Sequence, residues 1–245
     1  MKDMVEQHVS NSIPLVSNDN LAAESDCPNS SSRMLSFGQS QLVELFTDFR
    51  DAGAAGFALA QIPRSGRILW IQDRMAALET GRPFGRGCEW FGCSMDRLVL
   101  VCTRNTTDLL WAVEEALRCT SFAAIIGEVF GNPKVMDFTA SKRLAVRAEK
   151  QGVPLFLLRI NAQRDLSAAR RRWSVRSLPS APHPYDPNAP GAPRWHIDLF
   201  RARDTKPNQW IVQYDRAAHR LDLVSSLPDG AMAAPTGGTV RTGAR

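Results

Sequence analysis

The chain has 245 residues, of which 44% are hydrophobic and 22% are charged, with a net charge of +5, so one sizeable α/β domain of ordinary globular composition is expected. The five cysteines (Cys27, Cys88, Cys93, Cys102 and Cys119) lack the paired spacing of a secreted disulfide scaffold or a zinc site. No apolar stretch approaches the roughly 20 residues that span a bilayer. These features argue against secreted, zinc-dependent and membrane classes, and they predict a cytoplasmic protein with no membrane partner.

The two ends of the chain lack the patterns of packed structure. Residues 1–34 are rich in Ser and Asn and have few aliphatic side chains, and the chain from about 228 onward is rich in Gly, Ala and Pro. Such segments cannot bury enough apolar surface to offset the entropy of ordering them. We therefore expect disordered tails at 1–34 and 228–245 and one domain over 35–227.

The first structured unit is predicted to be a strand at 42–46, a helix at 54–62 and a second strand at 67–72. In a nucleotide-hydrolysing protein the loop before this helix is Gly-rich, and a following Lys-Ser/Thr pair holds the phosphates. Here the loop carries Asp48 and Asp51 and no Lys. Since carboxylates repel phosphate, the sequence predicts a nucleotide-binding-type fold without the nucleotide site.

Strands and helices alternate as far as residue 159. The alternation predicts a largely parallel sheet, with right-handed crossovers and helices that cover its faces. Between the second and third strands, residues 74–96 are predicted to form one helical turn and an irregular Gly-rich loop. Further strands are expected at 97–102, 122–129 and 153–159. One helix is expected at 108–119, with Thr106 or Thr107 as its N-cap. A second helix is expected at 139–151, with Thr139 or Ser141 as its N-cap and Gly152 at its end.

The pattern changes after residue 160. A polar, basic segment at 161–172 precedes a short strand at 173–178, and residues 179–193 form a loop with six prolines. Three alternating segments then predict an antiparallel meander that extends the same sheet, at 194–203, 209–214 and 220–224. The predicted fold class is α/β, with a mostly parallel sheet flanked by helices and a C-terminal antiparallel meander.

The order of these elements resembles the core of RecA, and several strings are similar to the ImuA proteins. These strings are GAAGFALA at 53–60, ILWIQ at 68–72, LWAVEEALRC at 110–119, FTASKRLA at 138–145 and PRW at 193–195. The similarity covers roughly residues 42–224, and the string at 110–119 is its most specific part.

The resemblance implies a RecA-like core and a non-catalytic adaptor in SOS-induced, error-prone translesion DNA synthesis. The adaptor would link an ImuB-type polymerase-like protein to an error-prone replicative-type polymerase and associate with the nucleoid during the damage response. RecA and DNA are further candidate partners. Two alternatives stay open: a SulA-like inhibitor that binds the tubulin-like division protein, and a RecA-type ATPase with an atypical site.

On the RecA resemblance, the phosphate lysine would fall near Gly53 and the magnesium hydroxyl near Ala54, and neither residue can serve. The carboxylate that polarises water would fall at Asp73 or Arg74, and a strand acid survives as Glu128. No catalytic, cofactor-binding or metal-binding residue is therefore expected.

The positive charge is concentrated in one region. Residues 139–176 hold ten Lys and Arg against two acidic residues, a net charge of +8 in a chain whose total is +5. On the RecA resemblance, part of this region occupies the position of a DNA-contacting loop. DNA contact, contact with an acidic protein, and a solvated surface beside a core tryptophan remain open. The candidate DNA- or partner-binding residues are Arg164, Arg170, Arg171, Arg172, Trp173 and Arg176.

Overall fold

The computed structural model describes residues 41–226, and the tails predicted at 1–34 and 228–245 lie outside the described residues. The described strands are β1 (Leu42–Thr47), β2 (Arg67–Asp73), β3 (Leu98–Thr103), β4 (Phe122–Phe130), β5 (Leu155–Ile160), β6 (Arg171–Leu178), β7 (Arg194–Ala202), β8 (Asn208–Asp215) and β9 (Arg220–Ser226). The described helices are α2 (Gly53–Leu59), α3 (Arg74–Thr80), α4 (Gly85–Trp90), α5 (Thr106–Ala116) and α6 (Phe138–Gln151), with a 3-10 turn, η1 (Met95–Arg97).

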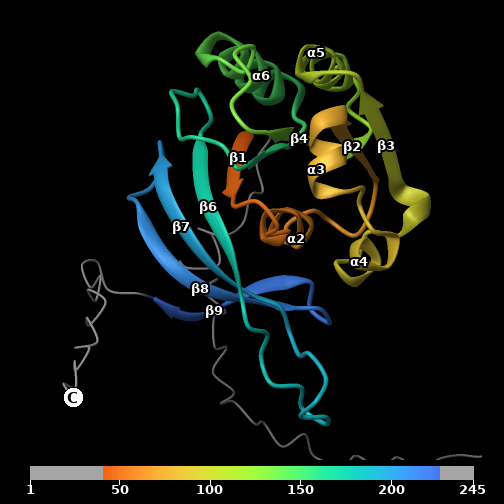
Figure 1. Cartoon of the computed structure of the whole chain (residues 1–245), viewed down its shortest axis with the longest axis vertical. Helices are drawn as coiled ribbons and strands as arrows, with labels where there is room; N and C mark the ends of the chain where they lie inside the picture. Colours follow the sequence, from red (N-terminus) through yellow and green to blue (C-terminus); the bar gives the residue numbers. More distant parts are fainter. Residues whose placement is uncertain (1–40, 227–245) are drawn as a thin grey trace, which may run out of the picture.

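These strands form one nine-stranded sheet in the order β3-β2-β4-β5-β1-β6-β7-β8-β9 (Figure 1). Neighbours from β3 to β6 pair in parallel, whereas β6 to β9 pair antiparallel. Strand β6 joins the two parts, because it lies parallel to β1 on one side and antiparallel to β7 on the other. The predicted fold class is confirmed.

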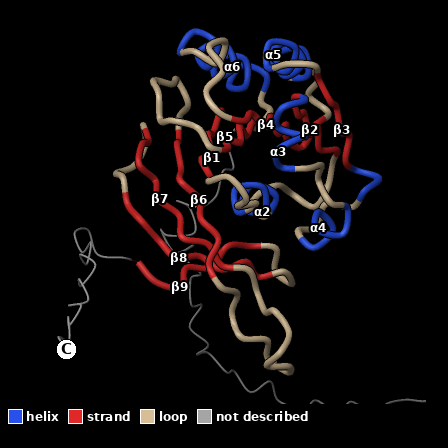
Figure 2. The backbone as a smooth tube through the Cα atoms, viewed as in Figure 1, coloured by secondary structure: helices blue, strands red, loops and turns tan. Residues whose placement is uncertain are grey.

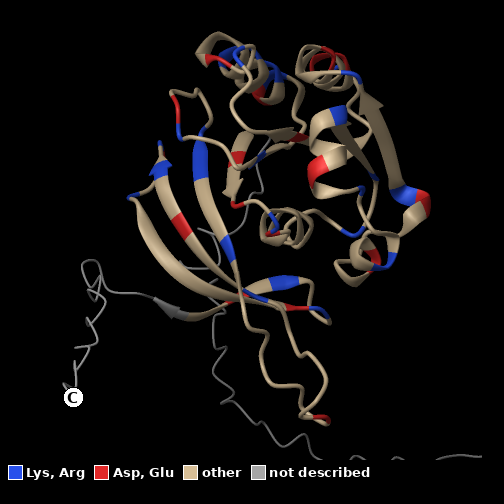
Figure 3. Cartoon of the chain, viewed as in Figure 1, with Lys and Arg blue, Asp and Glu red and all other residues tan. Residues whose placement is uncertain are grey.

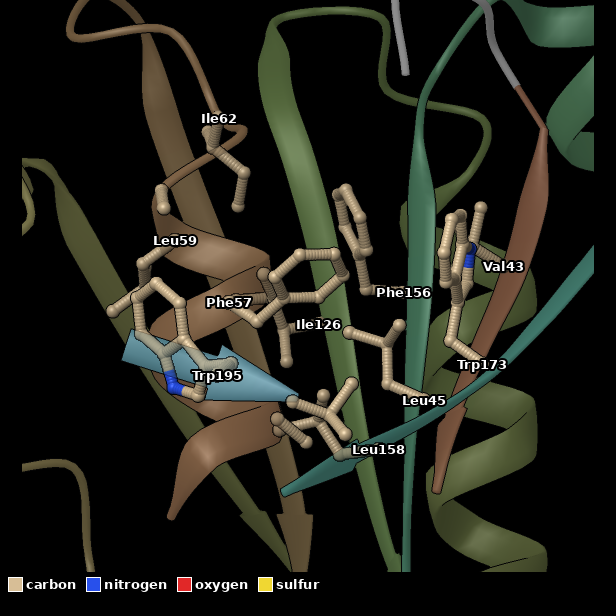
Figure 4. Packing of buried hydrophobic residues seen from close by; sticks show 14 of the residues in the cluster. Val43, Leu45, Phe57, Leu59, Ile62, Ile126, Phe156, Leu158, Trp173 and Trp195 are labelled. Atoms are coloured by element: carbon tan, nitrogen blue, oxygen red, sulfur yellow. The ribbon is translucent and has the colours of Figure 1, made fainter. Parts of the chain in front are cut away.

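The sheet is covered differently on its two faces. Helices α5 and α6 lie over one face of the parallel part, and α2 lies on the other, within the bend of strands β6–β9 (Figures 1 and 2). One core cluster joins α5 and α6 to the sheet, and a second joins α2 to both the parallel strands and the meander. Figure 4 shows Phe57 of α2 among the sheet residues Ile126, Phe156 and Trp195. Helix α2 therefore packs at the centre of the fold.

Helices α5 and α6 begin at residues that the sequence interpretation missed. The Asn105 side chain accepts a hydrogen bond from the Asp108 N–H at 2.9 Å, and Asp137 accepts one from the Ala140 N–H at 2.7 Å. The caps predicted at residues 106–107 and at 139 or 141 were therefore wrong by one or more residues. The predicted stop at Gly152 is confirmed, because this glycine has a positive φ of 75° that suits its residue type.

The segment between β2 and β3 is more regular than predicted. It forms the short helices α3 and α4 where one helical turn was expected. Cys88 and Cys93 are buried there as free thiols, and burial raises the pKa of Cys88 to about 11. Among residues 41–226, no helix combines the length and apolar character needed to cross a membrane.

Candidate functional site

The loop between β1 and α2 is occupied by a carboxylate of the chain itself. Asp51 accepts a hydrogen bond from the Gly53 N–H at 2.7 Å, at the start of α2. It also accepts bonds from the Ser177 N–H at 2.9 Å and the Ser177 hydroxyl at 2.6 Å. A nucleotide phosphate would take such backbone donors in a phosphate-binding loop. Here Asp51 takes them and ties the loop to β6.

The same contacts crowd any side chain, including a phosphate-binding lysine, at position 53. A Cβ added to Gly53 would lie 2.8 Å from the Ser177 Oγ and 2.9 Å from the Asp51 Oδ1. It would also lie 3.2 Å from the Ser177 backbone nitrogen, which a rotamer change cannot move. A larger residue at position 53 would therefore displace the contacts that Asp51 makes with Ser177.

The two carboxylates at the ends of neighbouring strands are held by structural hydrogen bonds. Asp73 is 2% exposed and accepts bonds from the Ala76 N–H at 2.8 Å and the Thr106 hydroxyl at 2.6 Å. Asp73 therefore caps α3 and links it to α5.

Glu128 accepts three hydrogen bonds in the interior. Its donors are the Trp70 indole at 2.9 Å, the Gln72 amide at 2.8 Å and the Thr80 hydroxyl at 2.5 Å. Burial raises the pKa of Glu128, although these three hydrogen bonds oppose the shift. The donors fix the carboxylate in place, and they leave little freedom to orient a water molecule.

A cavity of about 700 Å³ lies beside this loop, at the carboxyl ends of the parallel strands. Glu128, Gln72 and Asp51 contribute polar groups to its wall. The rest of its wall is largely apolar and includes Phe84, Phe91, Leu158, Ile160 and Trp195. Its lining suits apolar groups better than a triphosphate.

Three of the six candidate binding residues lie in the interior. Trp173 is 0% exposed and packs against Phe57 with ring centroids 5.9 Å apart. Arg172 is 3% exposed, and its Nε donates to Glu44 at 2.6 Å. Arg171 is 9% exposed and pairs with Asp204 at 2.8 Å. The interpretation of these three as surface contacts for DNA therefore needs correction: in this fold they hold the sheet together.

Arg172 belongs to a buried charge cluster in which arginines outnumber carboxylates. Glu44 is 0% exposed, accepts a hydrogen bond from the Ser167 hydroxyl at 2.9 Å and lies 3.6 Å from the Arg159 guanidinium. Arg159 is also buried, and burial lowers its pKa, while the carboxylate of Glu44 opposes that shift. Both guanidiniums lie over the Phe46 ring. The single carboxylate of Glu44 is shared by two buried cations.

The other three candidate residues lie at the surface, and the structure brings two of them together. Arg164 and Arg176 line a polar cleft of about 480 Å³ at the ends of β1 and β5, with His196 of β7. Arg164 lies 4.1 Å from the Phe200 ring and 3.7 Å from an Asp198 oxygen. Figure 3 shows basic residues on α6 and along β6 and β7. Arg170 lies apart from the cleft and pairs with Glu149 at 3.4 Å.

His196 and Asp198 were not among the sequence-predicted site residues. Both residues alternate with apolar residues along β7, and this alternation is visible in the sequence. It was therefore predictable that their side chains lie on the same face of the strand. Their proximity to Arg164 was not, because it depends on how the segment after β5 folds across β7.

Fold and loop together define a class: an α/β protein whose β1–α2 loop is closed by its own carboxylate. Over 188 residues, the chain is 32% identical to Protein ImuA of Caulobacter vibrioides in each of two strains. The alignment covers 71% of this chain and 72% of each relative. No protein-family model matches the chain. The chain therefore belongs to the ImuA family, which confirms the resemblance drawn from its sequence strings.

Proposed function

We propose that the protein is a non-catalytic adaptor of the ImuA/ImuB system of damage-induced mutagenesis. It links an ImuB-type polymerase-like protein to an error-prone replicative-type polymerase in translesion DNA synthesis, and it associates with the nucleoid through those partners. The ImuA relationship supports the pathway. The carboxylate of Asp51 on the backbone donors at the start of α2 supports the absence of ATP hydrolysis, and this contact carries the proposal.

The polar cleft is the surface that we assign to DNA or to RecA-bound DNA. Arg164 and Arg176 present guanidinium groups at its wall, and His196 adds a ring nitrogen. Arginine binds phosphate oxygens through two parallel N–H donors, so a short stretch of single-stranded backbone suits this lining. Asp48 and Asp198 also line the cleft, and they limit the length of polyanion that it accepts.

Co-purification of the full chain with the ImuB-type protein from the same genome tests the adaptor role. We expect a stable complex whose formation does not change when ATP is added or removed. A chain that retained neither ImuB nor the polymerase, while remaining folded, would reject the adaptor role.

The DNA contact is tested separately by fluorescence polarisation with labelled single-stranded DNA. We expect the combined Arg164→Ala and Arg176→Ala substitutions to weaken binding, and to lower the salt dependence by about 0.7 in log-log slope for each phosphate that the protein no longer neutralises. Arg104→Ala is the matched control, since the side chain of this arginine is 89% exposed and, among the described residues, forms an ion pair with Asp108 near the start of α5. Equal effects of the control and cleft variants would place the DNA contact elsewhere.

A further inference from the structure

The apolar cavity beside α2 continues into a second hollow. Ser177, Pro193 and Trp195 line both, so the two adjoin along the ends of β6 and β7. The second hollow has a volume of about 350 Å³, and its other lining residues include Trp90, Leu178 and Pro190. Together they form one groove, which we call the α2 groove.

The rim of the α2 groove carries large side chains that solvent reaches. Phe84 is 72% exposed at the wall of the larger hollow, and Trp90 is 43% exposed at the wall of the smaller one. Exposing aromatic surface to water costs free energy, and partner segments commonly bury such rings in their complexes. Two exposed rings at separate positions suit a ligand that spans both hollows.

The two carboxylates inside the groove are already engaged. Asp51 and Glu128 each accept three hydrogen bonds from the protein. They offer a ligand few free acceptor positions, and their negative charge disfavours phosphate. The lining is otherwise largely apolar, so we expect most of the affinity in the interior of the groove to come from apolar contact.

The charges at the rim are mostly basic. Arg50 and Arg82 are exposed at the larger hollow, and Arg194 lines the smaller one, whereas Glu79 is the exposed acid among the lining residues. A ligand with apolar anchors and flanking carboxylates complements both the interior and the rim.

We propose that the α2 groove binds an extended, acidic segment of the polymerase-like partner, with one apolar side chain in each hollow. This inference rests on the proposed adaptor function, and it names the surface through which the adaptor holds its partner. The place where related folds hold a nucleotide is thus used for a peptide.

The test measures fluorescence polarisation of labelled, overlapping synthetic peptides that tile the ImuB-type protein, mixed with the full chain. We expect binding by peptides that combine apolar residues with Asp or Glu. Phe84→Ala and Trp90→Ala are each expected to weaken that binding about tenfold. Gly87→Leu should also weaken peptide binding, because Gly87 lines the larger hollow and a leucine there would fill part of it. The added side chain has room to start, since the nearest atom to its Cβ belongs to Phe84, at 3.7 Å.

Two exposed aromatic residues on the other side of the sheet supply matched controls. Phe138 of α6 is 47% exposed and Trp111 of α5 is 67% exposed, and neither lines the groove. Their alanine variants should bind the peptide within about twofold of the original chain. Equal thermal unfolding midpoints for all four alanine variants would show that the fold is intact.

Each remaining outcome decides the proposal. The groove proposal is rejected if the full-length partner co-purifies but no peptide binds. It is also rejected if peptide affinity is unchanged by Phe84→Ala and Trp90→Ala. In both cases the adaptor role stands. If the full-length partner does not co-purify, the adaptor role itself fails. Tight binding of a fluorescent ATP analogue that Gly87→Leu abolishes would make the occupant a nucleotide.

Discussion

Replacement of Glu44 by alanine is expected to destabilise the protein more than any surface change. Glu44 is 0% exposed, and Arg159 and Arg172 are each 3% exposed. Alanine would leave both guanidiniums in the interior without a carboxylate. Removing one partner from a buried ion pair costs about 3–5 kcal/mol, because the remaining charge stays desolvated. The loss is large against a total stability of about 5–15 kcal/mol.

Urea unfolding followed by tryptophan fluorescence measures this loss, and the buried Trp173 makes fluorescence sensitive to the core. For a domain of this size, the same loss corresponds to a melting temperature lower by about 6–20 °C. Glu149→Ala provides the control, because Glu149 forms an exposed ion pair with Arg170. Such exposed pairs contribute about 0.2–1 kcal/mol.

A second variant separates the charge from the packing. Combining Glu44→Leu with Arg159→Met and Arg172→Met removes all three charges and keeps most of the volume, so it should recover much of the stability lost in Glu44→Ala. Unfolding of Glu44→Ala at nearly the same urea concentration as the original chain would contradict this role of Glu44. A triple variant less stable than Glu44→Ala would show that the loss does not arise from the unpaired charges.

Three further outcomes follow from the loop and from Glu128. Gly53→Lys should destabilise the fold by about 1–3 kcal/mol in thermal unfolding, and it should not create ATP-analogue binding, because the new side chain collides with Ser177. Asp51→Ala should lower the melting temperature, since three donors lose their acceptor; an unchanged midpoint would contradict this role. Burial raises the pKa of Glu128 above its ordinary 4.5, so the stability it contributes is present below that pH and falls as pH rises through the folded pKa. Glu128→Gln should therefore gain stability relative to the original chain as pH rises above about 4.5 in urea titrations, and parallel pH profiles would refute the assignment.

The order of strands and helices was predictable, because each element is encoded by local periodicity and ends near a Gly, Pro or capping residue. Residues 173–178 illustrate the limit. Alternation along β6 predicts that Arg172 and Trp173 face opposite sides of the sheet, but not that both sides are covered there. Arg172 can be buried because it forms an ion pair with Glu44, which lies 128 residues away along the chain. A local sequence pattern cannot predict such a pairing.

The candidate site was predictable only in part. The carboxylates Asp48 and Asp51 and the lack of a lysine in the loop were visible in the sequence. The hydrogen bonds that hold Asp51 were not, because two of the three donors belong to Ser177, far away along the chain. Exposure of Arg164 and Arg176 likewise depends on the packing of the segment after β5. The sequence predicted the type of residue in the site, and tertiary packing decided which of those residues meet solvent.

The hydrogen bonds of Asp51 also bear on how the protein is controlled. A loop that binds a nucleotide is occupied only while nucleotide is present, so its conformation can depend on the ATP concentration in the cell. Asp51 is covalently part of the chain, and its effective concentration at the start of α2 therefore never varies. If the proposed adaptor role holds, we expect the amount of protein and the presence of its partners, rather than a hydrolytic cycle, to set its activity.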